Sequence, residues 1–163
     1  PGDANGRDPV LHVAKEQGYL VGKNIIAAAQ GEPVEPYQHT NHRVTFAGAG
    51  LYPVVRIGHT VRSAHEAGHA TVTATRKAAD DGVFRAKDVP HGLARIVVDA
   101  DDGTALGYQA MHYHADAMAK TMQVLIEMEL DIREVPDRAY HPTTPEILDG
   151  LIRETADLVA TSN

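Results

Sequence analysis

Apolar positions divide the chain into an N-terminal helical segment and a longer segment that begins with strands. Apolar side chains recur at helical intervals and predict a helix over residues 9–29: Val10, Val13, Ala14, Val21 and Ile25. Asp8 is the expected N-cap, with Pro9 in the first turn. Residues 30–42, polar and interrupted by glycine and proline, predict an extended linker. We therefore expect one domain over residues 1–39 and a second over residues 40–163.

The second segment begins with patterns typical of strands. Residues 43–46, 53–58 and 70–75 are rich in β-branched residues and predict three strands, the first two separated by a break at residues 47–50. Thr60 is placed to cap a short helix that ends before Gly68. Residues 93–100 and 105–112 flank an Asp-Gly pair, which predicts a β-hairpin. Residues 76–90 are mixed and polar, and we expect a loop there.

Helical stripes complete the pattern and give the fold class. A helix over residues 115–130 is predicted by one apolar stripe: Met118, Met122, Leu125 and Ile126. These methionines are expected to fill the core, with a subunit interface as the alternative. A last helix, capped by Thr144 with Pro145 in its first turn, is expected to bury one face: Ile147, Leu148, Leu151, Ile152, Leu158 and Val159. The sum is an α+β fold in which helices cover an antiparallel sheet.

Composition excludes several classes of protein and site. The 163 residues include 15 basic and 22 acidic ones, a net charge of -7, which argues against a nucleic-acid-binding face. No apolar run is long enough to span a bilayer, so we expect no membrane partner. Cysteine is absent, which excludes disulfides, thiolate metal sites and a cysteine nucleophile within this chain. We expect a cytoplasmic location, with which this absence is compatible.

The strongest candidate site is the turn that contains His141 and Glu146. Pro142 favours an extended conformation at His141, and Glu146 falls in the first turn of the expected helix. A carboxylate at this spacing could orient the imidazole, which is the commonest proton-transfer group near neutral pH. The alternative is a solvated histidine beside a charge that interacts with the helix end.

Two weaker candidates involve other histidines and the N-terminus. His39 and His42, and likewise His112 and His114, have spacings that metal ligands can adopt, but too few ligands are evident and we predict no metal site. Gly2-Asp3 precedes the first helix, where its carboxylate could bind a sugar-alcohol hydroxyl; a flexible chain end is the alternative. No Gly-x-Gly-x-x-Gly loop, P-loop or nucleophile elbow is present.

Together these motifs resemble the C-terminal third of the pyridine nucleotide-disulfide oxidoreductases, with the dihydrolipoamide dehydrogenases as the nearest group. The resemblance is carried by Gly2-Asp3, by the segments at residues 11–14, 22–25 and 42–46, and by His-Pro-Thr-Thr-Pro-Glu at residues 141–146. It implies that residues 1–39 are the C-terminal tail of an FAD-binding domain and that residues 40–163 are a dimerisation domain. The expected glycine fingerprints and redox-active cysteine pair would then lie upstream in a longer protein.

The resemblance also implies roles for single residues. Asp3 matches the residue that binds the flavin ribityl chain, and Val10, Leu11 and His12 match the segment whose backbone reaches the isoalloxazine edge. His141 matches the acid/base that crosses to the partner subunit's flavin and disulfide, and Glu146 matches the carboxylate that orients it.

The implied parent is a homodimeric enzyme that uses FAD and NAD(P) and acts on a small dithiol or a lipoyl domain. This chain alone is then expected to bind no cofactor and to be inactive. Two departures from the family pattern, Ala47-Gly48-Ala49-Gly50 and Ala139, leave the substrate open to other disulfides or mercuric ion. The competing hypothesis is a stand-alone, non-enzymatic α+β dimerisation module.

Overall fold

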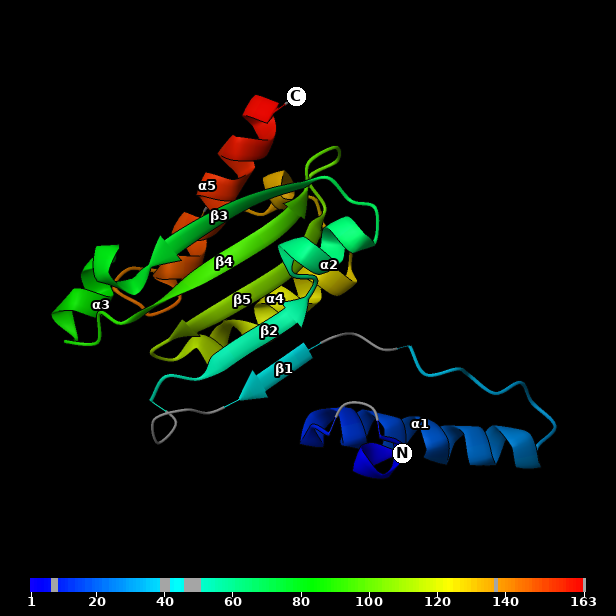
Figure 1. Ribbon diagram of the computed structural model, residues 1–163. Coiled ribbons are helices and arrows are strands. Elements are labelled where there is room, and N and C mark those ends of the chain that lie inside the picture. Colours follow the sequence, from blue (N-terminus) through cyan, green and yellow to red (C-terminus); the bar gives the residue numbers. More distant parts are fainter. Residues whose placement is uncertain (7–8, 39–41, 46–50, 137, 163) are drawn as a thin grey trace. The chain divides into compact units, whose positions relative to one another are not determined.

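The computed structural model describes residues 1–6, 9–38, 42–45, 51–136 and 138–162, and divides the chain into two units, residues 1–39 and residues 40–163 (Figure 1). The division follows from the contacts within each unit. That the first unit derives from a flavin-binding domain stays a prediction.

The first unit contains the predicted helix, α1, Leu11–Ala29, preceded by a short 3-10 helix, η1, Gly2–Asn5. Val10 occupies the N-cap position, so Pro9 lies before the helix rather than in its first turn, and the expected cap Asp8 lies outside the described residues. Only part of the predicted apolar stripe is covered, because Val13 is buried while Ile25 is 65% exposed.

Hydrogen bonds tie the segments before and after α1 to the side chains of that helix. The carbonyl oxygen of the nearly buried Gln17 side chain accepts from the backbone N–H of Gly2 at 2.7 Å and from the side chain of Asn5 at 2.8 Å. Beyond the helix, the amide of Asn24 donates to the carbonyl of Glu35 and accepts from its N–H, at 2.8 and 2.9 Å. Residues 32–38 of the predicted linker contain no helix or strand, and Asn24 ties them to α1 by pairing with both backbone groups of Glu35.

The second unit is built on a five-stranded sheet whose neighbouring strands are all antiparallel, in the order β1-β2-β5-β4-β3. The α+β class is confirmed, and so are the strands predicted within the described residues and the hairpin, although the break at residues 47–50 lies outside them. The strand bounds are β1 His42–Thr45, β2 Val54–Gly58, β3 Thr71–Lys77, β4 Gly92–Asp99 and β5 Ala105–His112.

Helices cover the sheet unequally (Figure 1). Helix α4, Ala119–Glu127, and helix α5, Glu146–Ser162, lie over one face and complete the main core with Tyr108 and Ile96. On the other face lies α2, Val61–Glu66, where Ala64 packs against Val97 and Leu106. Each face is thus apolar where a helix covers it, as expected for layered packing.

Helix caps account for one confirmed prediction, the cap at Thr60, and for one wrong prediction, the loop over residues 76–90. Thr60 caps α2 as predicted, and its side chain accepts from the backbone N–H of Ser63. The loop expected over residues 76–90 is wrong, because β3 runs on to Lys77 and is followed by the 3-10 helix η3, Ala78–Asp80, and helix α3, Gly82–Ala86. Asp81 nucleates α3 by accepting from the first N–H groups of that helix.

The predicted helix over residues 115–130 is also divided. It begins as the 3-10 helix η4, Ala115–Met118, continues as α4 and is followed by another 3-10 helix, η5, Ile132–Glu134. Met118 and Met122 are buried, as predicted for core residues, whereas Met128 is 64% exposed. Among the described residues, no helix combines the length and apolar character needed to cross a bilayer.

Candidate functional site

His141 and Glu146 lie in hydrogen-bonding contact. Nδ1 of His141 is 2.7 Å from Oε2 of Glu146. The His141 side chain is 72% exposed, whereas the Glu146 side chain is 30% exposed. The structure therefore brings this predicted pair together and leaves the imidazole open to a reacting group from outside the unit.

The turn that presents His141 is closed by short-range hydrogen bonds. The His141–Pro142 peptide bond is cis, and the hydroxyl of Thr143 donates to the carbonyl of Tyr140. The backbone N–H of Glu146 donates to the carbonyl of Thr143 at 3.2 Å. These bonds fold residues 140–146 into a compact corner directly before α5.

A lysine from a distant segment also contacts this corner. Nζ of Lys87, the residue that ends α3, donates to Oγ1 of Thr144 at 3.1 Å. The hydroxyl of Thr144 is thus engaged with Lys87, and α5 begins at Glu146 rather than at the expected Pro145. The carbonyl of Pro145 accepts the first helical bond, from Leu148 at 2.8 Å.

Helix α5 anchors the corner in the core. Ile147 and Leu151 are fully buried and Val159 is buried further along, but Leu158 is 38% exposed, which corrects its predicted place on the buried face. Gly150 leaves room for Arg76 of β3, whose guanidinium would lie 2.8 Å from an added Cβ. Because Ile147 directly follows Glu146, core packing anchors the backbone from which the carboxylate projects.

The hydrogen bond sets the tautomer of the imidazole. An ionised carboxylate can only accept, so Nδ1 of His141 carries the proton that it donates to Glu146. Nε2 of the neutral ring is then a free lone pair on an exposed side chain. This arrangement suits a general base that takes a proton at Nε2 while the carboxylate stabilises the resulting imidazolium.

The residues predicted to contact flavin lie in the first unit. Asp3 is exposed in η1, and Leu11, at the start of α1, is 78% exposed. Val10 makes no capping hydrogen bond with its side chain, and His12 is half-buried. An exposed carboxylate can accept from hydroxyls, and the first N–H groups of a helix can donate to a carbonyl, which is the chemistry that the predicted flavin contacts require.

His112 and His114 form no common site. His112 is buried against the ring of Phe84, at 5.2 Å between ring centroids, whereas the exposed His114 follows the strand in a left-handed conformation and packs on Tyr113. Because β5 ends at His112, His114 lies beyond the strand and the two rings do not share a face of it. His39 lies outside the described residues. Burial lowers the pKa of His112, against a hydrogen bond to the Tyr113 carbonyl and the charges of Asp81 and Asp116.

A second histidine–carboxylate pair has no counterpart among the sequence-based predictions. Nδ1 of His69 lies 2.6 Å from Oδ2 of Asp99, a residue 30 positions away. Only the pairing of β3 with β4 brings these segments together, with Thr71 opposite Asp99. No local spacing could have indicated this contact.

Comparison with known proteins relates the second unit to one family. Residues 50–151 match the family described as pyridine nucleotide-disulphide oxidoreductase, dimerisation domain. The chain is 29% identical over 154 residues to a dihydrolipoyl dehydrogenase of Synechocystis, covering 91% of this chain and 31% of that protein. It is 26% identical over 148 residues to a dihydrolipoyl dehydrogenase of Mycobacterium leprae, covering 90% of this chain and 31% of that protein.

A solved structure shows the same fold. The crystal structure of LpdA from Mycobacterium tuberculosis matches 94% of this chain and 32% of that chain, with a TM-score of 0.77 and 18% sequence identity. This chain thus spans less than a third of each of these relatives.

Proposed function

Because the chain belongs to the pyridine nucleotide-disulphide oxidoreductase family, we propose that it supplies the acid/base histidine of a flavin-dependent dithiol/disulfide oxidoreductase of the dihydrolipoamide dehydrogenase type. The observation that carries this proposal is the hydrogen bond of 2.7 Å between His141 and Glu146 on an exposed corner of the dimerisation domain. The relatives are about three times as long as the matched region, which supports a parent enzyme with further domains.

We assign residues 1–39 to the end of an FAD-binding domain and residues 40–163 to the dimerisation domain of that parent. The family match begins at residue 50 and lies within the second unit, which supports this division. The reacting sulfur atoms must come from elsewhere, since this chain contains no cysteine. An exposed histidine on a dimerisation domain is suited to reach the disulfide of a partner subunit, so activity would require the homodimer.

The proposed step is a proton transfer at sulfur. Nε2 of His141 accepts the proton of a substrate thiol, which makes the thiolate that attacks the active-site disulfide. Glu146 remains the acceptor for Nδ1–H and stabilises the positive charge that the ring gains. In the reverse direction, the same imidazolium returns the proton to the leaving thiolate. A small dithiol or a lipoyl group on a protein domain would both meet this requirement.

The cofactors of the proposed parent are FAD and NAD(P). Asp3 would accept from the ribityl hydroxyls, and the backbone at Val10, Leu11 and His12 would lie against the flavin ring. When bound, the flavin carries electrons between the thiol pair and the nicotinamide nucleotide. This chain's part is to hold the flavin at its edge and to move one proton at His141.

The test is the variant His141→Gln in the full-length enzyme. Dithiol turnover should fall by roughly 10²- to 10⁴-fold, the range for losing a general acid/base, while the dimer and its bound FAD persist. His114→Gln, an exposed histidine that lies outside the corner, is the matched control and should retain full activity. A loss of less than about twofold in His141→Gln would refute the proposed acid/base. A start codon directly before Pro1, with no upstream enzyme, would instead favour the stand-alone module.

A further inference from the structure

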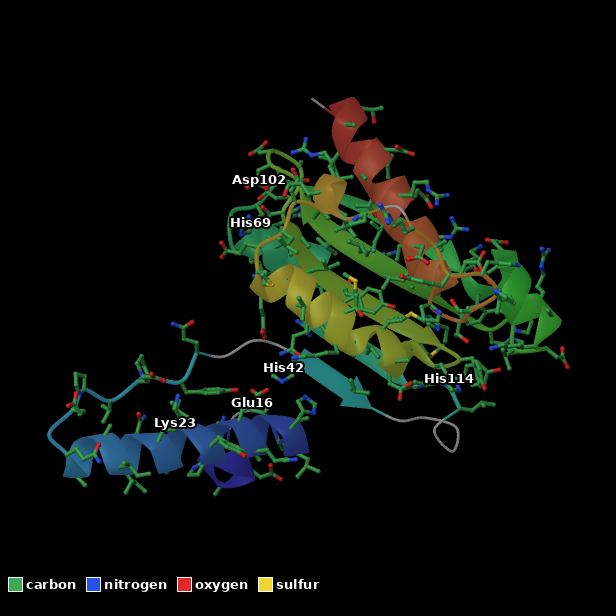
Figure 2. All side chains as sticks on the ribbon, turned by 180° about the vertical axis from the view of Figure 1, so that it is seen from behind. Glu16, Lys23, His42, His69, Asp102 and His114 are labelled. Atoms are coloured by element: carbon green, nitrogen blue, oxygen red, sulfur yellow. The ribbon has the colours of Figure 1, made fainter. Side chains whose placement is uncertain are left out.

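A pocket at the end of the sheet that carries the β4–β5 turn gathers two histidines and three carboxylates. Its volume is about 410 Å³, and the polar side chains that line it are those of His59, His69, Asp99, Asp102, Thr104 and Glu129. The rings of His59 and His69 lie 6.0 Å apart between centroids. Figure 2 shows His69 and Asp102 at this end of the unit and His114 at the other. We call it the His59–His69 pocket.

The orientation of His69 is fixed by Asp99. Oδ2 of Asp99 accepts from Nδ1 of His69 at 2.6 Å, and Oδ1 accepts from the backbone N–H of Asp101 at 2.9 Å. The backbone N–H of His69 donates to the carbonyl of Ala64 at 3.0 Å. Nδ1 therefore holds the ring proton, and Nε2 is left as a lone pair.

The backbone of His59 is held by two hydrogen bonds to residues of β5. Its backbone N–H donates to the carbonyl of Leu106 at 2.9 Å, and its carbonyl accepts from the Gln109 side chain at 2.8 Å. Gly107 lies directly beneath this carbonyl and has no Cβ that would collide with it. Nδ1 of His59 lies 3.3 Å from Oγ of Ser63, which also accepts from the backbone N–H of Thr60 at 2.9 Å. A metal ion at Nε2 of His59 requires the ring proton on Nδ1, the nitrogen that faces Oγ of Ser63.

The charges around the two rings favour a cation. The lining contains the carboxylates of Asp99, Asp102 and Glu129 but no lysine or arginine. Within the described part of the chain, no side-chain partner is found for the Glu129 carboxylate. Ile126, in the last turn of α4, also lines the pocket, and the carbonyl end of a helix attracts positive charge.

We propose that the His59–His69 pocket binds a divalent transition cation such as Zn²⁺ through Nε2 of His59 and Nε2 of His69. A histidine whose Nδ1–H is held by a carboxylate is the usual form of a metal ligand, and Asp99 gives this support to His69. Among the described residues, no group of three or more histidine, aspartate or glutamate side chains is placed to hold a metal ion, so the protein would supply these two nitrogen ligands. Water would therefore complete the coordination.

Imidazole nitrogen determines which metals the pocket should prefer. Two imidazoles favour Zn²⁺, Co²⁺, Ni²⁺ and Cu²⁺ over Mg²⁺ and Ca²⁺, which require a shell of oxygen ligands. The site is independent of the proposed acid/base. Asp99 and Thr71 pair at this end of β4 and β3, whereas Lys87, which contacts the His141 corner, follows α3 beyond the opposite end of β3.

Calorimetric titration of the 163-residue chain with Zn²⁺ tests the proposal without interference from thiols, because the chain has no cysteine. One saturable equivalent should bind, and excess Mg²⁺ or Ca²⁺ should not displace it. The double variant His59→Gln/His69→Gln should abolish this binding. Asp99→Asn should weaken it by roughly 10- to 100-fold, the usual cost of losing a supporting hydrogen bond. His65→Gln, an exposed histidine on α2, is the matched control and should bind as the unmodified chain does.

Imidazole NMR of the unmodified chain gives a second measurement that does not depend on the variants folding. Zn²⁺ should shift the Nε2 resonances of His59 and His69 and leave those of His65 and His91 in place. Shifts confined to other histidines, binding that survives in a folded double variant, or equal binding of Ca²⁺ would each overturn the proposal.

Discussion

Glu146 accepts a hydrogen bond of 2.7 Å from His141, and this single contact leaves Nε2 of the ring as the nitrogen with a free lone pair. Glu146→Gln removes the negative charge that stabilises the imidazolium but keeps the size of the side chain. In the full-length enzyme, we expect a turnover loss of roughly 10- to 100-fold, less than that for His141→Gln. Steady-state kinetics with a dithiol measures the loss. Glu154→Gln, on the same helix but paired with Arg76, should leave turnover unchanged; equal losses in both variants would contradict the assigned role.

The buried face of α5 should dominate the stability of the second unit. Ile147 is fully buried, so Ile147→Ala removes apolar contacts and leaves a cavity, with an expected cost of about 2–5 kcal/mol in the free energy of unfolding. Leu158→Ala, on the same helix but 38% exposed, should cost about 1 kcal/mol or less. Urea denaturation of both variants checks the contrast, and similar losses would show that the assigned burial is wrong.

Gly107 of β5 should tolerate no side chain. A Cβ there would lie 1.8 Å from the carbonyl oxygen of His59, so Gly107→Ala must displace the backbone between β2 and α2. We expect a loss of about 1–3 kcal/mol in stability, the usual cost of overpacking. Gly22→Ala is the contrasting change, because no atom lies within 4 Å of the added methyl group. It should stabilise α1 by up to about 1 kcal/mol. Thermal unfolding of each variant measures whether the stability falls, as expected for Gly107→Ala, or rises, as expected for Gly22→Ala.

His112 should make the protein less stable in mild acid. Burial lowers its pKa, so between the usual value of about 6.5 and the lower native value, the unfolded state binds a proton that the native state does not. The free energy of unfolding therefore falls as the pH drops below about 6.5, by at most about 1.4 kcal/mol per pH unit. Denaturation midpoints across this range should depend less on pH in His112→Leu. The control His114→Gln should keep the original slope, and an unchanged slope in His112→Leu would exclude His112 as the source.

Local signals in the sequence predicted most of the fold. The Asp-Gly turn, the cap at Thr60 and the apolar stripe of α5 act over a few residues, and the structure shows each of them. Helix α3 was missed because it has only five residues, too few for an apolar period, and depends on its cap Asp81. Leu158 fits the helical period of α5 but is 38% exposed, and periodicity alone gave no sign of this.

The candidate sites show the same limit. His141 and Glu146 are five residues apart, so a turn before a helix indicated their contact as one of two alternatives, and the structure shows the contact. His59 and His69 meet only because α2 returns the chain toward the sheet, and Asp99 reaches His69 only through strand pairing. Contacts of this kind depend on the tertiary fold, which no spacing along the chain records.

The fully buried Ile147 directly follows Glu146, with Leu151 buried one turn later. The orientation of the proposed acid/base, His141, therefore depends on buried side chains of α5 that do not contact the substrate. A random-mutagenesis screen for inactive enzyme should recover hits deep in this interior as well as at the surface corner. Conservative substitutions of these buried residues should give enzymes that still assemble but turn over slowly, rather than proteins that fail to express.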